Sequence, residues 1–179
     1  IHKIGFTHDD WYLMASAGAE GPGVFHTIYS VDRPLRAYVL APAFELFGQN
    51  VLFYNLSAWA FRVLSAILFL WLLRMLWPGW AVWTWLMAVL YLIYPGFLSQ
   101  LNGIDYQSQI LSLALATLSV ALTVAVYFQE NIIYKMLGVS LSILLGLLYL
   151  GLVDYEAGFE LMRLAILFTL AGRAAKSFR

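Results

Sequence analysis

The chain has 179 residues, of which 63% are hydrophobic and only 11% are charged, whereas soluble domains average about 45–50% apolar and about 25% charged residues. This difference is too large for a buried core alone, and it predicts that lipid surrounds most of the chain. Ten basic and ten acidic residues balance, which gives no indication of nucleic-acid binding. The absence of cysteine excludes disulfides, thiolate metal ligands and cysteine nucleophiles.

Residues 1–50 are mixed in polarity, and no window among them holds the roughly 20 apolar residues that a membrane span requires. Residues 9–19 predict a short helix, which ends at the turn signal Gly21-Pro22-Gly23. A second short helix is predicted over 34–47, with Pro34 near its start, where proline is tolerated. Both helices are expected to lie along the membrane surface.

From residue 51 onward the sequence predicts an all-α integral membrane protein with about five transmembrane helices. Pro78-Gly79 and Pro95-Gly96 end the first two spans. The chain is therefore expected to divide into a surface loop over 1–50 and a helical bundle over 51–179. The spans are expected at 51–77, 80–94, 105–128, 136–153 and 159–171. Small side chains in the third span (Ser108, Ser112 and Ala116) and in the fourth (Gly138, Gly146 and Gly151) predict a bundle of closely packed helices.

Basic residues orient this bundle. Arg74, Lys135 and the run Arg173, Lys176 and Arg179 all fall on one side when the spans alternate, and the positive-inside rule makes that side cytoplasmic. Lys3, Arg33 and Arg36 fall on the other side and count against this orientation. The loop over 1–50 is then exoplasmic, together with the acids Asp9, Asp10, Glu20, Asp32, Asp105, Asp154 and Glu156.

The adjacent acids Asp9 and Asp10 are the first candidate catalytic residues. One carboxylate could act as a general base while the other orients it or binds a metal. The alternative is that they cap the short helix that follows, since aspartate favours the first turn. A divalent metal ion held by His8, Asp9 and Asp10 is a weaker hypothesis, because three consecutive residues rarely coordinate one ion alone.

Three arginines are candidate ligands of a substrate phosphate. Arg33 and Arg36 lie on the predicted surface segment, and arginine is suited to bidentate phosphate contacts. Their partners are either lipid headgroups or a bound lipid-phosphate substrate. Arg62 lies inside the first predicted span, where a charged residue is functional or paired within the bundle. Its candidate partners are Glu160, Glu45 and the exoplasmic acids.

A second acidic cluster is predicted at the entry to the fifth span. Glu156, Glu160 and Arg163 are spaced to share one helix face, and Asp154 precedes them. We expect this face to line a polar cavity, although Glu160 and Arg163 could simply pair. Asp105 lies in a polar segment on the same side, where it supports the cluster or caps the third span.

Taken in order, several segments resemble the N-terminal part of polytopic glycosyltransferases of the GT-C class. They are Asp9-Asp10-Trp11, Arg33-Pro34-Leu35, a span that ends near Arg74, Tyr94-Pro95-Gly96-Phe97 and Glu160-Leu161-Met162-Arg163. The resemblance implies a polyprenyl-phosphate sugar donor, transfer on the exoplasmic side and a multi-pass protein of the bacterial cytoplasmic membrane. It also implies that Asp9 or Asp10 is the catalytic base and that arginines stabilise the departing lipid phosphate.

The sequence departs from this class because it lacks a span before the first loop, the later spans and a soluble C-terminal domain. We therefore expect it to be part of a longer chain. Two other hypotheses stay open. The chain could be a non-catalytic helical subunit that contacts membrane lipid and other membrane subunits. It could also belong to a transporter, which Arg62 favours, although no repeat or pair of broken helices is visible.

Overall fold

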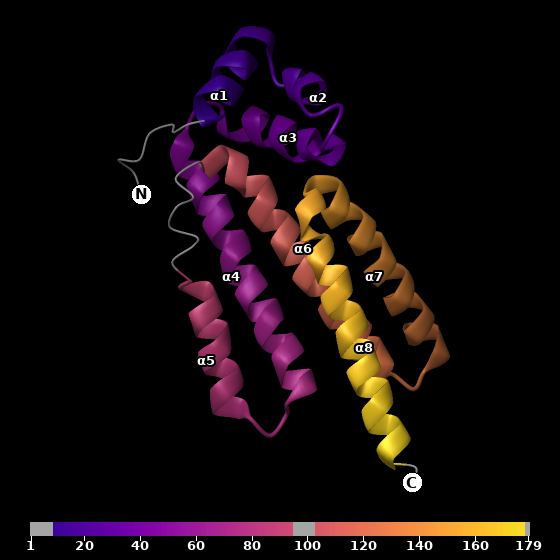
Figure 1. Cartoon of the computed structure of the whole chain (residues 1–179). Helices are drawn as coiled ribbons and strands as arrows, with labels where there is room; N and C mark the ends of the chain where they lie inside the picture. Colours follow the sequence, from indigo (N-terminus) through magenta and orange to yellow (C-terminus); the bar gives the residue numbers. More distant parts are fainter. Residues whose placement is uncertain (1–8, 95–102, 178–179) are drawn as a thin grey trace.

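The computed structural model describes residues 9–94 and 103–177, with side chains up to residue 173, and every regular element in these ranges is helical. Helices α4 to α8 run side by side, and α1 to α3 lie across one end of them (Figure 1). We call residues 9–47 the head. The elements are α1 Asp9–Glu20, α2 Val24–Ile28, η1 Pro34–Arg36, α3 Ala37–Phe47, α4 Val51–Leu76, α5 Ala81–Leu92, α6 Gly103–Tyr127, α7 Ile132–Leu152, η3 Asp154–Ala157 and α8 Gly158–Ser177.

Three of the described helices, α4, α6 and α7, are long and apolar enough to cross a membrane. Helix α5 has 12 residues, which corresponds to about 18 Å at 1.5 Å per residue. Helix α8 has 20 residues but carries Glu160, Arg163 and Arg173. The described residues therefore confirm helical structure and helices suited to a membrane, three of which are both long and apolar enough to cross it. The number of about five spans stays a prediction.

The helix starts depend on capping side chains. The side chain of Asn50 accepts a hydrogen bond from Leu52 N at 3.2 Å and begins α4. Asn131 accepts from Ile133 N at 2.9 Å in the same way, and α7 therefore begins four residues before the predicted position. Helix α8 continues past the predicted end at 171, because the alanines and lysine after Gly172 favour a helix.

Both helices that the sequence predicts within residues 9–47 are present in the head. The short helix α2, which lies between them, was not predicted. The prediction over 9–19 corresponds to α1, which ends at Gly21 with φ +86°. The prediction of a helix over 34–47 is confirmed, and this helix begins with a 3₁₀ turn, η1, before it continues as α3. Pro34 is the first residue of the turn, where its missing N–H donor costs no helix hydrogen bond.

The head has its own apolar core, which extends onto the bundle. Leu13 and Met14 of α1 pack with Phe25 of α2 and Leu40 of α3, and Ile104 of α6 completes the cluster. Tyr38 and Leu46, on the opposite face of α3, are exposed. The head is thus fixed to the first turn of α6 by buried apolar side chains, while an outer apolar face stays uncovered.

Helix α6 is the central helix of the bundle, since it packs along both α4 and α7 and is the most buried of the three apolar helices. Glycines on α7 permit close approach: Gly138 lies against Val126, and Gly151 lies against Leu35 of the head. Helices α4, α6 and α8 lead away from the head, and α5 and α7 lead back toward it (Figure 1).

Candidate functional site

The carboxylate of Asp10 caps a helix other than its own. Asp10 is fully buried, and its Oδ1 accepts a hydrogen bond from Asp105 N at 3.0 Å. The N–H of Ile104 also acts on this carboxylate. The first N–H groups of a helix have no partner within the helix, and its N-terminus favours negative charge. Asp10 therefore completes the start of α6 from the head.

Burial changes the titration of Asp10. It raises the pKa of the carboxyl to about 6, although the N–H groups of Asp105 and Ile104 lower the pKa. Its second oxygen, Oδ2, is buried and has no hydrogen-bond partner among the described residues. The negative charge of an ionised Asp10 is thus only partly stabilised by hydrogen bonds, and Asp10 binds a proton more readily than an exposed aspartate does.

The side chain of Arg36 lies in the same cluster and is enclosed by the protein. Arg36 is 1% exposed, and its Nη2 lies 2.8 Å from Asp105 Oδ1. It also donates to Asp105 O at 2.5 Å and, through Nε, to Ser108 Oγ at 2.6 Å. Its guanidinium lies over the ring of Tyr29, at 5.1 Å from the centroid. A substrate phosphate could reach Arg36 only if these contacts opened.

Asp9 and Arg33 are accessible to solvent, whereas the nearby Asp10 and Arg36 are buried. Asp9 is exposed in the first turn of α1. The Arg33 side chain is 28% exposed, and its Nε lies 3.7 Å from Asp154 Oδ1 and 3.9 Å from Asp32 Oδ2. These ion pairs are long and partly solvated, so Arg33 can exchange them for another anion at little cost.

Glu156 forms a buried acidic position between α7 and α8. It is 9% exposed, and its Oε2 accepts a hydrogen bond from Ser112 Oγ at 2.6 Å. Burial raises the pKa of Glu156 to about 7, although the Ser112 hydroxyl lowers it. The neighbouring Tyr155 donates to Gln109 Oε1 at 2.7 Å, and Gln109 Nε2 donates to Asp105 Oδ2 at 2.9 Å. Side chains of α6 therefore bond to two residues of η3, and the chain of hydrogen bonds from Tyr155 through Gln109 reaches Asp105.

Glu160 and Arg163 pair with each other, as one of the two hypotheses expected. Arg163 Nη2 lies 3.2 Å from Glu160 Oε1. Tyr149 of α7 donates a short hydrogen bond to Glu160, and Arg163 donates one to Ser119 of α6. The pair therefore joins α8 to both α6 and α7 and satisfies its charges inside the bundle.

Arg62 lies apart from the other two arginines. It projects from the middle of α4, and its Nη2 donates to Tyr94 O at 3.4 Å, beyond the end of α5. Glu160, one of its expected partners, pairs with Arg163 instead. The structure thus brings Arg36 together with Asp10 and Asp105, and it separates Arg62 from them.

The metal hypothesis receives no support from the described residues. His8 lies outside them, and no group of three or more histidine, aspartate or glutamate side chains in 9–94 and 103–177 could hold a metal ion. Asp10 already accepts hydrogen bonds from α6.

Ser112, Tyr149 and Tyr29 were not predicted as partners of these charges. Ser108 and Ser112 were interpreted only as small residues for close packing, yet both hydroxyls bond to charged side chains. Their spacing with Asp105 and Ser119 places them on one face of α6, and this polar face could have indicated a hydrogen-bonded seam.

Comparisons with protein-family models, with curated proteins and with solved structures find no match to this chain. The relation to the GT-C class therefore stays a prediction from the residues.

Proposed function

We propose that this chain carries the acceptor-activating part of a GT-C-like membrane glycosyltransferase, which transfers a sugar from a polyprenyl-phosphate donor on the exoplasmic side. The supporting observation is that two adjacent carboxylates have different environments. Asp10 is buried and caps α6, whereas Asp9 is exposed one residue earlier. The cap holds α1 in place, so Asp9 is a fixed carboxylate that an acceptor can approach.

In this proposal Asp9 is the general base and Asp10 is its positioning residue. Asp9 takes the proton of the acceptor hydroxyl while the acceptor oxygen forms a bond to the anomeric carbon of the sugar. The bond from that carbon to the phosphate oxygen breaks, and its electron pair leaves with the lipid phosphate. Arg33 offsets the negative charge that develops there, because it is an accessible arginine of the head and its own ion pairs are long.

We propose further that α5 and α8 enter the membrane with α4, α6 and α7, in a bacterial cytoplasmic membrane with the head on the exoplasmic side. Helix α8 measures about 30 Å by its 20 residues, which equals the thickness of the hydrocarbon layer. Its charges at Glu160 and Arg163 pair with each other, which lowers the cost of their insertion. Arg74, Lys135 and Arg173 belong to the helix ends opposite the head, as the positive-inside rule requires.

The test is sugar transfer by the full chain in proteoliposomes that contain a labelled polyprenyl-phosphate sugar. Asp9→Asn should reduce transfer by about 10²–10⁴-fold, which is the usual contribution of a general base. Glu20→Gln is the matched control, because Glu20 is an exposed acid at the other end of the same helix. Thermal unfolding of both variants should match that of the wild type.

Transfer that survives in Asp9→Asn would show that Asp9 is not the base. If the wild-type chain has no transfer activity and is purified only with other membrane proteins, the non-catalytic subunit hypothesis is correct. The enclosed position of Arg36 favours that second function, because a residue expected to bind substrate is used for internal packing.

A further inference from the structure

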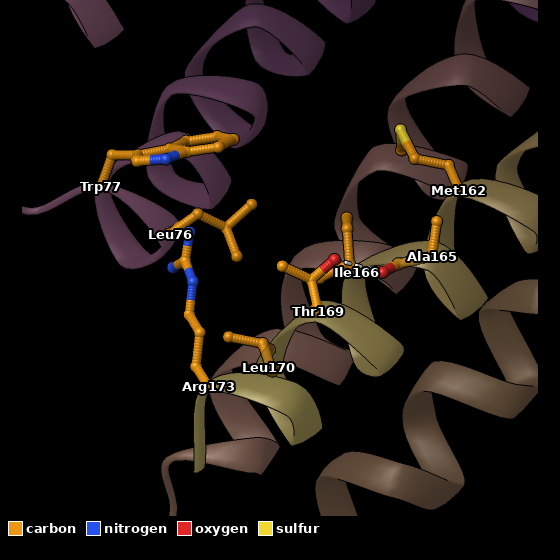
Figure 2. A pocket seen from close by; sticks show the side chains of 8 residues that line it. All are labelled: Leu76, Trp77, Met162, Ala165, Ile166, Thr169, Leu170 and Arg173. Carbon is orange, nitrogen blue, oxygen red and sulfur yellow. Dashed lines mark hydrogen bonds between the residues drawn. The ribbon is translucent and has the colours of Figure 1, made fainter. Parts of the chain in front are cut away.

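A small apolar groove lies between the end of α4 and helix α8 (Figure 2). These parts of α4 and α8 lie at the end of the bundle opposite the head (Figure 1). The volume of the groove is about 170 Å³, and Trp77, Thr169 and Arg173 at its edges are exposed. Its floor includes Leu170, which belongs to a buried cluster with side chains of α4 and α6. The groove is thus open outward and closed by packed side chains below.

Two polar groups in the groove walls already have hydrogen-bond partners. Thr169 donates its hydroxyl to Ala165 O at 2.8 Å, so the methyl group remains for contacts. The carbonyl of Leu170 accepts from the hydroxyl of Tyr127 at 3.2 Å. The walls therefore offer mainly hydrocarbon contacts, and their side-chain donors for a ligand are the Trp77 indole N–H and the Arg173 guanidinium.

Arg173 closes one end of the groove. Figure 2 shows its side chain extending from α8 toward α4, with the guanidinium beside Leu76. Arg33, Arg36 and Arg163 form ion pairs with described carboxylates, whereas Arg173 forms none with a described residue. An apolar groove that ends at a guanidinium is complementary to a lipid that has an acyl chain and an anionic headgroup.

We propose that this groove binds an anionic membrane phospholipid, with one acyl chain between α4 and α8 and the headgroup phosphate on Arg173. The groove is smaller than the roughly 300–1,000 Å³ of pockets that take whole small molecules. A segment of one acyl chain fits this smaller volume.

The predicted orientation agrees with this occupant. Arg74, Arg173 and Lys135 belong to the helix ends on the proposed cytoplasmic side, where the leaflet carries anionic lipids. The inference does not depend on glycosyl transfer, because no residue of the groove belongs to the proposed catalytic site.

The test is lipid retention by the full chain, measured by native mass spectrometry with phosphatidylglycerol and phosphatidylcholine of identical acyl chains. The wild type should retain phosphatidylglycerol preferentially. Arg173→Gln should lower that preference about fivefold, which corresponds to the roughly 1 kcal/mol of one basic residue near an anionic surface. Lys135→Gln, at the same end of the bundle but on α7, should leave the preference unchanged.

Two further measurements locate the acyl chain. Thr169→Trp should fill the groove and remove retention of both lipids, with helicity checked by circular dichroism. Phosphatidylglycerol with brominated acyl chains should quench tryptophan fluorescence, and Trp77→Phe should remove a large share of that quenching. The proposal is wrong if Arg173→Gln and Thr169→Trp retain phosphatidylglycerol as the wild type does. It is also wrong if both lipids bind equally, or if a dimer of the chain excludes them.

Discussion

Asp10 and Asp105 are 95 positions apart, and the backbone N–H of Asp105 donates to Asp10 Oδ1 at 3.0 Å. The side chain of Asp105 meanwhile pairs with Arg36, whose guanidinium lies 2.8 Å away. One aspartate therefore uses its backbone to hold α1 and its carboxylate to hold η1. Asp105 therefore contacts two elements of the head, in addition to the apolar contacts that the head makes with Ile104. A substitution of its side chain should remove only the contact with η1, because the backbone N–H remains.

Removal of the Asp10 carboxylate should loosen α1. Asp10→Ala leaves the N–H groups of Asp105 and Ile104 buried without their acceptor, and this should lower the free energy of unfolding by about 1–3 kcal/mol. Hydrogen exchange of the α1 and early α6 amides should increase in the same variant. Asp9→Ala, at an exposed position, should leave both measurements near wild type. Equal effects of the two variants would contradict the capping role.

The pair of Arg36 and Asp105 should show strong energetic coupling. Arg36→Met leaves Asp105 without its cation, and Asp105→Asn leaves a buried guanidinium without its anion, so each should cost about 3–5 kcal/mol. The double variant should cost clearly less than the two single variants together, because no unpaired charge remains. Unfolding in mixed micelles measures all three. Additive costs would mean that the two side chains do not depend on each other.

Glu156 should make stability depend on pH in a defined direction. Its pKa is raised from 4.5 to about 7, so the folded state binds this proton more tightly than the unfolded chain does. Its contribution to stability is fully present below pH 4.5 and is lost as the pH rises through about 7. Glu156→Gln should remove this loss and flatten the thermal unfolding midpoint between about pH 5 and pH 8.

Ser112→Ala provides a matched comparison for Glu156, because the Ser112 hydroxyl lowers the same pKa. Ser112→Ala should raise the pKa of Glu156 further and move the loss of stability to higher pH, whereas Glu156→Gln should abolish this loss. An unchanged pH profile in both variants would show that Glu156 does not govern it. Asp10, whose pKa is raised for the same reason, should add a separate loss of stability as the pH rises through about 6.

The two ends of the bundle should face opposite sides of the membrane. The chain has no cysteine, so Glu20→Cys and Glu130→Cys each introduce one unique thiol. Glu20 ends α1 in the head, and Glu130 lies in the exposed connection between α6 and α7. An impermeant maleimide applied from outside should label the first variant in intact cells and the second only after permeabilisation. Labelling of both in intact cells would contradict the proposed orientation.

Much of the fold follows from local sequence, whereas the candidate site depends on contacts between distant residues. The ends of α4 and α6 lie within two residues of the prediction, because apolar length and the Pro78-Gly79 turn are local properties. The start of α7 was placed too late because Asn131 was not recognised as a cap. The burial of Arg36 could not be predicted, since its partners Asp105 and Ser108 lie 69 and 72 positions away and no local pattern connects them.

Closure of the α6 start by Asp10 also constrains how the chain is made. Helix α1 is synthesised long before α6, and its carboxylate has no helix to cap until α6 has been synthesised. Helices α4 and α5 are neighbours in sequence and can pair as they leave the ribosome. The contacts of Arg36 and Asp10 with Asp105 can therefore form only after 69 and 95 further residues have been synthesised.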